Sequence, residues 1–208
     1  MLHSITSQMG KGKTLLMSLY ALEYSKQYKN NMIYANYSLD LKNFIYTPYL
    51  FLPFSKLQNC LLLIDDIYAL QNLSSFVSVV VNMSRKMDIH ILVSAQRRTM
   101  IIPLIRSLGN MYEVEYDKEL DILVVKEYQD SINFEEKDIR FFGIKNAVKT
   151  VKDIYNTNEI VKFATKTAIK KEILKYSKNK EDLELNVAIF TKSETKSTKL
   201  VKELSDFL

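Results

Sequence analysis

The chain has 208 residues, enough for one domain with an extension or for two small domains. Its 47% of hydrophobic residues allows an ordinary core and excludes a disordered tail, and its formal net charge is +5. A single cysteine, Cys60, excludes a disulfide framework and favours a reducing compartment. No window holds the ~18 apolar residues of a membrane-spanning helix, so we expect a soluble protein and not an integral membrane protein.

The first predicted element is a short strand at 2–6, and the octapeptide SQMGKGKT follows it directly. Apolar residues at helical spacing then predict a helix at 13–28, and a further strand is predicted at 32–37. Strand, tight loop and helix form the context in which a Gly-Lys-Thr loop binds phosphates. Two of the four glycines of the chain lie in the octapeptide, which favours a phosphate loop over a lysine-rich turn.

The loop is expected to hold the phosphates of ATP by its backbone N–H groups, at the positive end of the helix. Lys13 is expected to contact the β- and γ-phosphates, and the hydroxyl of Thr14 to bind Mg²⁺. Ser7 departs from the pattern, because a glycine usually stands there, and Gly10 adds flexibility within the loop. The residues expected around the phosphates are Ser7, Gln8, Met9, Gly10, Lys11, Gly12, Lys13 and Thr14.

The segment CLLLIDD at 60–66 is a continuous apolar run that ends in two acids, which predicts a central parallel strand. Asp65, at its end, is the expected second ligand of Mg²⁺, opposite Thr14. Asp66 is the candidate that polarises an attacking water, although many ATPases use the longer Glu there. The alternative is that both acids cap the next predicted helix, at 69–86.

The segment IHILVSAQ at 89–96 predicts a second buried strand, beside the strand of Asp65. Gln96, at its end, is expected to orient the attacking water, or otherwise only to end the strand. Arg85, just before this strand, is the candidate for a guanidinium that enters the active site of a neighbouring subunit. The competing candidates for that role are Arg97, Arg98 and Arg106.

Further along, 97–107 predicts a loop and a short helix, and the alternating stretches 111–117 and 120–128 predict an antiparallel hairpin. Strands that alternate with helices in the first hundred residues indicate a mostly parallel sheet. The expected fold is therefore an α/β P-loop NTPase whose central sheet is flanked by helices. We expect a core with the hairpin at 1–145, and a basic, mainly helical extension at 146–208 packed on it.

The C-terminal part of the chain carries the excess charge. Residues 145–208 hold fourteen lysines against nine acidic residues, which accounts for the whole net charge of +5. Lysines at roughly helical spacing in this part are Lys162, Lys166, Lys170, Lys171, Lys175, Lys178 and Lys180. They form either a solvated helix face or a non-specific contact with nucleic-acid phosphates, and composition does not choose between the two.

Taken together, SQMGKGKT, LLLIDD and SRKMDIHILVSAQRR resemble the ATPase core of the FtsK–HerA superfamily. Within it they are most similar to genome-packaging ATPases of double-jelly-roll viruses, archaeal ones included. The segment DIYNTNEIV at 153–161 resembles a Tyr-(Asp)-Thr-x-Glu segment of those viral members, with Asn156 in the Asp place. The resemblance covers roughly residues 1–161. It implies a homo-oligomeric ring that hydrolyses ATP with Mg²⁺ at subunit interfaces and translocates double-stranded DNA into a capsid.

The same resemblance implies a protein of the host cytoplasm, transiently at the virion vertex, that docks on capsid or internal-membrane proteins. Three alternatives remain open. Filamentous-phage assembly ATPases related to zonula occludens toxin share the phosphate loop but usually carry a transmembrane segment after the core. A small-molecule kinase would need an arginine-rich lid, whereas four of the five arginines lie at 85–106 and only Arg140 lies beyond. A non-hydrolysing assembly or partition factor would use Asp66 only as a cap.

Overall fold

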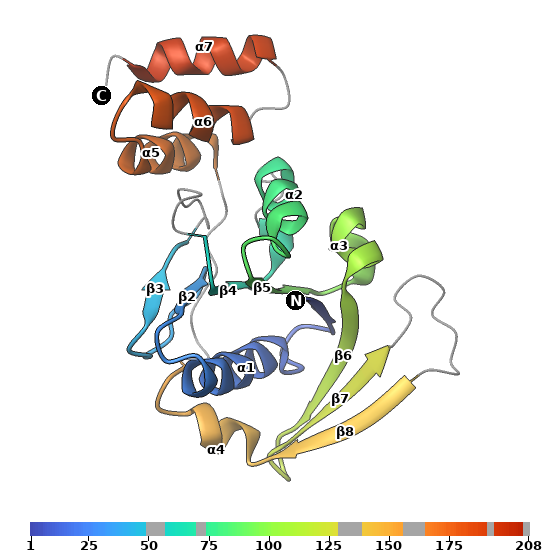
Figure 1. The fold of residues 1–208 in the computed structure, drawn as a ribbon. Helices are drawn as coiled ribbons and strands as arrows, with labels where there is room; N and C mark the ends of the chain where they lie inside the picture. The colour runs from blue at the N-terminus through green and yellow to red at the C-terminus, as the bar shows by residue number, and fades with distance from the viewer. Residues whose placement is uncertain (49–56, 70–73, 129–138, 156–164, 191–193, 206–208) are drawn as a thin grey trace.

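The computed structural model describes residues 1–48, 57–69, 74–128, 139–155, 165–190 and 194–205. An eight-stranded sheet lies at its centre, in the order β3-β2-β4-β5-β1-β6-β7-β8 (Figure 1). The strands are β1 (Leu2–Thr6), β2 (Met32–Ala35), β3 (Phe44–Tyr46), β4 (Cys60–Ile64), β5 (Ile89–Ala95), β6 (Asn110–Asp117), β7 (Ile122–Tyr128) and β8 (Ile139–Lys145).

The six strands from β3 to β6 in this order are parallel, and β7 and β8 add an antiparallel extension to β6. Strand β5 lies between β1 and β4, with Thr6 opposite Ala95 and Val93 opposite Ile64. The residues that follow β1, β4 and β5 therefore meet at one edge of the sheet, where open α/β sheets bind ligands. The predicted α/β fold with a mostly parallel sheet and an antiparallel hairpin is confirmed.

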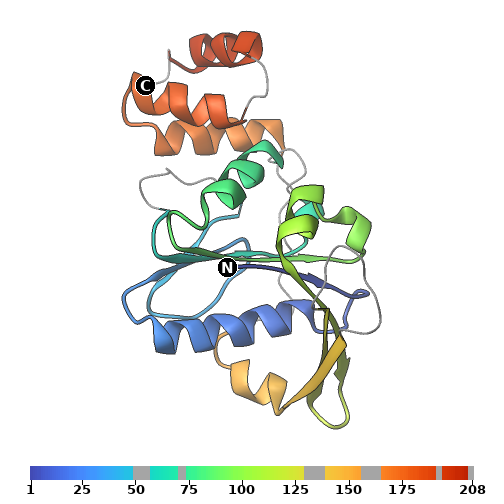
Figure 2. The ribbon, with the colours of Figure 1, turned by 45° about the vertical axis from the view of Figure 1, so that its right-hand side comes forward.

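Helices cover both faces of the sheet (Figures 1 and 2). One face carries α1 (Lys13–Gln27) and α4 (Ala147–Val151), and the other carries α2 (Ser74–Met83) and α3 (Pro103–Leu108). A 3-10 turn at Arg98–Met100 leads from β5 toward α3. Beyond α2 lie three more helices, namely α5 (Lys166–Tyr176), α6 (Lys180–Phe190) and α7 (Glu194–Ser205).

Strand β4 shows how the two apolar cores share one sheet. All five of its residues are buried. Leu61 and Leu63 pack with α1, whereas Leu62 and Ile64 pack with α2, because successive side chains of a strand point to opposite faces. A strand covered on both faces reads as an unbroken apolar run, which is the pattern that predicted it.

The C-terminal helices continue the core on the α2 face. Apolar side chains of α5, α6 and α7 belong to the same buried cluster as Val77 and Val80 of α2. In contrast, α4 packs on α1 through Ala147 and Val151, although it lies just beyond residue 145. The expected division of the chain at that residue stays a prediction. Among the described residues, no helix combines the length and apolar character needed to cross a bilayer.

Two described strands escaped the sequence prediction, namely β3 and β8. Strand β3 has three residues, too few for a period-2 pattern to show. In β8 four successive residues, including Phe141 and Phe142, are exposed, so apolar and polar positions do not alternate. The helix expected at 69–86 ends earlier, at Met83, because a turn with Asp88 at φ 49° leads into β5. Positions 70–73 of that expected helix lie outside the described residues.

Candidate nucleotide-binding site

The predicted phosphate loop joins β1 to α1, and its two glycines have left-handed backbones. Gly12 caps α1 with φ 95°, and Gly10 has φ 74°. A Cβ on Gly12 would lie 2.6 Å from Leu123 Cδ1 and 3.1 Å from Tyr116 Cβ. Both backbone conformation and space therefore require glycine at position 12. The β6–β7 hairpin, which carries Tyr116 and Leu123, packs directly against the loop.

Lys13 lies inside the curve of this loop. Its Nζ donates hydrogen bonds of 2.9 Å to the carbonyl oxygens of Ser7 and Gln8, and the side chain is buried. Burial lowers the pKa of Lys13, and the carboxylates of Asp65 and Asp66 oppose that shift. Two backbone carbonyls thus hold the ammonium at the centre of the loop. Phosphate oxygens can replace these carbonyls as hydrogen-bond acceptors.

Thr14 and Asp65 meet although they lie on different elements. The hydroxyl of Thr14, in the first turn of α1, donates a 2.7 Å hydrogen bond to Asp65 Oδ2, directly after β4. Mg²⁺ at phosphate sites takes one or two carboxylates, a hydroxyl and phosphate oxygens, so this donor set fits the ion. The described residues hold no cluster of three or more His, Cys, Asp or Glu side chains, which such a site does not need.

Two buried polar residues fix Asp65 in place, and sequence reasoning missed both. Asn36, fully buried after β2, donates to the carbonyl oxygen of Asp65 and accepts from its N–H, each at 2.7 Å. The hydroxyl of Ser94 in β5 donates to Asp65 Oδ1. The available signal was a polar side chain at the end of an apolar strand, Asn36 in ANY and Ser94 in SAQ.

Asp66 takes a left-handed conformation, φ 47°, which non-glycine residues adopt rarely. Its N–H donates to Ser94 Oγ at 2.9 Å and to Asp65 Oδ1 at 3.1 Å. Burial raises the pKa of Asp66, the Asp65 carboxylate raises it further, and Lys13 opposes the shift. The backbone turn therefore places a second, partly buried carboxyl beside Thr14 and Asp65, the candidate metal-binding pair.

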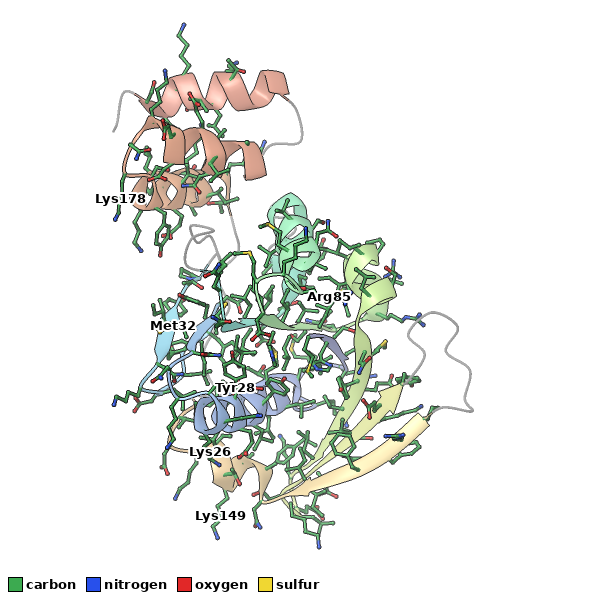
Figure 3. The ribbon with its side chains drawn as sticks, in the orientation of Figure 1. Lys26, Tyr28, Met32, Arg85, Lys149 and Lys178 are labelled. Carbon is green, nitrogen blue, oxygen red and sulfur yellow. The ribbon has the colours of Figure 1, made fainter. Side chains whose placement is uncertain are left out.

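Gln96 and Arg85 lie at opposite ends of β5. Gln96 directly follows that strand, partly exposed, and the adjacent Ala95 carbonyl accepts the N–H of Ser7 at 3.4 Å. Arg85 lies exposed in the turn before β5 (Figure 3). Seven residues of strand, at about 3.3 Å each, separate the two by roughly 23 Å. The structure thus brings Gln96, but not Arg85, to the loop of its own chain.

The remaining predicted residues lie around the loop. Met9 and Gly10 form its outer turn, with Met9 largely exposed, and Lys11 forms a 2.8 Å ion pair with Glu115 of β6. Of the competing arginines, Arg97 and Arg98 follow Gln96, while Arg106 lies in α3. Burial lowers the pKa of Arg98, and the nearby Arg106 lowers it further.

A cavity of about 410 Å³ opens at this edge of the sheet, within the range of nucleotide and small-molecule sites. The loop forms one part of its wall, and the hairpin and the segment around α4 form the rest. The lining residues are Gly10, Gly12, Lys13, Thr14, Leu15, Asp65, Tyr116, Lys118, Val148 and Tyr155. Sequence reasoning missed Tyr116, Lys118, Val148 and Tyr155, because only the tertiary fold brings them to the loop.

A loop of this sequence joins β1 to α1, Asp65 follows β4, and β5 lies between β1 and β4 in the sheet. This arrangement defines a P-loop NTPase-like fold. No protein-family model matches the chain, and no curated protein matches it. Among solved structures, the fold is similar to the N-terminal domain of zonular occludens toxin from Neisseria meningitidis. The TM-score is 0.48 at 15% identity, over 80% of this chain and 95% of that chain. This likeness concerns the fold alone, and no functional assignment rests on it.

Proposed function

We propose that this protein binds ATP with Mg²⁺ and hydrolyses it. The observation that carries the proposal is the 2.7 Å hydrogen bond between Thr14 and Asp65, beside the buried ammonium of Lys13. A hydroxyl, a carboxylate and a lysine converge there at the start of a helix. The adjoining loop curves around the lysine and can enclose phosphate groups. Few functions other than nucleotide binding require that combination.

In the bound state, phosphate oxygens replace the carbonyls of Ser7 and Gln8 as acceptors for Lys13, and N–H groups at the start of α1 bind the same oxygens. Thr14 and Asp65 would hold Mg²⁺, which neutralises charge on the β- and γ-phosphates. Asn36 and Ser94 keep the Asp65 carboxylate oriented toward Thr14, so that little rearrangement is needed when the nucleotide binds.

Hydrolysis requires a positioned water. The water oxygen forms a bond to the γ-phosphorus, while the bond from that phosphorus to the β–γ bridging oxygen breaks and ADP leaves with this oxygen. We assign Asp66 as the acceptor of the proton that the water loses, and Gln96 as the amide that orients the water. Both residues follow strands that end at the loop, and the raised pKa of Asp66 suits a proton acceptor.

A second copy of the chain is part of this proposal. No arginine is among the described residues that line the cavity, whereas many NTPases use a guanidinium to stabilise charge on the transferring phosphoryl group. Arg85 is exposed at the opposite edge of the sheet, where a neighbouring subunit in a ring can receive it. We therefore propose a homo-oligomer in which Arg85 of one subunit completes the site of the next.

Two uses of this ATPase remain as finer proposals. The sequence resemblance favours translocation of double-stranded DNA into a capsid, with docking on capsid or internal-membrane proteins in the host cytoplasm. The alternative is an assembly ATPase of filamentous-virus type.

The testing experiment is ATP turnover by the full chain with Mg²⁺, with and without double-stranded DNA. Turnover that Lys13→Ala abolishes supports the ATPase. Stimulation by DNA then favours translocation, and turnover indifferent to DNA favours the assembly role. A wild-type chain that neither binds nor hydrolyses ATP at any Mg²⁺ concentration overturns the proposed function.

A further inference from the structure

We infer that the base of the nucleotide lies against Tyr116, with Tyr155 as the second aromatic wall of the same cavity. The inference rests on the proposed ATPase function and deepens it, because it concerns how the nucleoside is recognised rather than the phosphates. It assigns a role to the part of the cavity that the phosphate loop and the metal-binding pair do not explain.

Tyr116 is fixed next to the start of α1. Its Cβ lies 3.1 Å from the place of a Cβ on Gly12, and its hydroxyl donates a 3.0 Å hydrogen bond to Asp121 Oδ1. The carboxylate of Asp121 also accepts the N–H groups of Val148, at 2.8 Å, and Lys149, at 3.3 Å. The ring is therefore held between the hairpin and α4, and as a half-buried side chain it keeps surface open to the cavity.

Tyr155 reaches the cavity from the other side of the phosphate loop. It forms an antiparallel bridge with Leu39, which follows β2, whereas Tyr116 belongs to β6 on the opposite side of β1. Its ring meets the buried ring of Tyr37 edge-on, at a centroid distance of 5.8 Å and an angle of 84°. Tyr155 is also the aromatic residue of DIYNTNEIV, whose positions 156–161 lie outside the described residues.

The composition of this wall suits a nucleobase. Aromatic rings stack on any base because every base has a π-face, and Leu15 and Val148 add apolar surface. Lys118, exposed in the hairpin turn, lies beside these groups as a cation for the ribose or phosphate side. A bare polyphosphate chain would use the loop, Thr14 and Lys13 but would gain nothing from the two tyrosines.

The test compares dissociation constants for ATP and for inorganic tripolyphosphate, measured by calorimetry on the full chain with Mg²⁺. Tyr116→Leu and Tyr155→Leu should each raise the dissociation constant for ATP by roughly 5- to 150-fold, the range of single stacking contacts. Tripolyphosphate should change by less than about twofold. Tyr116→Phe, which keeps the ring, should bind ATP nearly as wild type. The matched control is Tyr128→Leu, because Tyr128 belongs to the same hairpin, bonds Glu113 at 2.8 Å and does not line the cavity.

Equal changes for both ligands, or no change for either, would overturn the assignment of the base while leaving the ATPase proposal intact. Failure of the wild-type chain to bind either ligand, or binding that Lys13→Ala does not weaken, would overturn the proposed function itself. A second measurement needs no variant. Photolabelling of the wild-type chain with 8-azido-ATP should modify the peptide of Tyr116 or of Tyr155, and excess ATP should prevent it. Specific labelling confined to other peptides would refute the inference.

Discussion

Asn36 and Asp65 hold each other by two reciprocal hydrogen bonds of 2.7 Å, one from the amide nitrogen of Asn36 and one from the backbone nitrogen of Asp65. The pair ties the end of β2 to the end of β4. It fixes the backbone that carries the carboxylate facing Thr14, without contact to that carboxylate itself. Asn36 is thus a positioning residue of the candidate site.

The first prediction concerns this pair. Asn36→Ala leaves a buried N–H and a buried carbonyl of Asp65 without their Asn36 partners, and each such group costs about 1–3 kcal/mol in the free energy of unfolding. It should also raise the Mg²⁺ concentration needed for half-maximal turnover. Urea unfolding and Mg²⁺ titrations measure the two effects. Asn186→Ala is the control, because Asn186 is equally buried and bonds Ser177 at 3.0 Å in the C-terminal helices. It should lower stability and leave the Mg²⁺ requirement unchanged, and an identical shift in both variants would contradict the positioning role.

The second prediction separates the two lysines of the loop. Lys13→Ala should abolish hydrolysis and greatly weaken nucleotide binding, because Lys13 alone lies within the curve of the loop. Lys11→Ala should keep both, because Lys11 lies on the outer turn and forms an exposed ion pair with Glu115. Such pairs contribute about 0–1 kcal/mol to stability. Nucleotide binding and phosphate release are the measurements, and the reverse result would mean that the loop has been aligned wrongly.

The third prediction concerns the proton acceptor. Asp66→Asn should leave nucleotide binding nearly intact and slow hydrolysis by about 10²- to 10⁴-fold. The wild-type rate should fall as the pH falls through the raised pKa of Asp66, because only the ionised carboxylate accepts a proton. Loss of that acid limb in the variant would identify the group, whereas loss of nucleotide binding would give Asp66 a structural role.

The raised pKa of Asp66 also affects how the free energy of unfolding depends on pH. A carboxyl group whose pKa is higher in the folded than in the unfolded chain binds more protons when folded, so its contribution to stability falls as the pH rises through that window. At neutral pH the ionised Asp66 therefore opposes folding. Asp66→Asn should unfold at a higher urea concentration than wild type at pH 7, and a smaller difference is expected near pH 4.

The fourth prediction concerns the shared site. Arg85→Ala and Lys13→Ala should each be inactive alone, and mixtures should regain partial activity, since some interfaces pair an intact loop with an intact arginine. An arginine supplied by a neighbour is worth about 10³- to 10⁵-fold in rate in well-studied NTPases. Turnover is measured against mixing ratio at concentrations where sizing shows assembly. Mixtures that stay inactive at every ratio would exclude Arg85, and the same pairing would then be applied to Arg97, Arg98 and Arg106.

The fifth prediction concerns the lysines of α5 and the following turn. Lys171 and Lys178 are exposed, so each replacement by alanine should flatten a log–log plot of DNA affinity against salt by about 0.9 units. Lys170→Ala is the control, because Lys170 is half-buried and forms a 2.5 Å ion pair with Glu203. An unchanged slope in all three variants would leave these lysines as a solvated face. Lys162 lies outside the described residues.

The parts of the fold that sequence predicted are those with a local pattern. The unbroken apolar run of β4 and the short stretch from Ser7 to Thr14 each predict their own geometry, and together they predict the meeting of Thr14 and Asp65. Asn36 could not be predicted in this way. A single polar residue after a strand gives the same sequence pattern whether its side chain bonds a neighbouring strand or only marks the end of its own strand. The place of Tyr116 in the site is harder still to predict, because nothing in a hairpin sequence indicates which loop the hairpin will cover.

Gly12 has no room for a side chain, because Leu123 and Tyr116 of the hairpin occupy that space. A direct steric contact therefore links the phosphate loop to β7, and β7 is hydrogen-bonded to the edge strand β8. If the proposed hydrolysis changes the shape of the loop, this contact would carry the displacement through β7 to that edge. There Phe141, with 69% of its surface exposed, presents an apolar face to solvent. Hydrolysis in the phosphate loop would then move the exposed edge strand β8, where a partner molecule has access to Phe141.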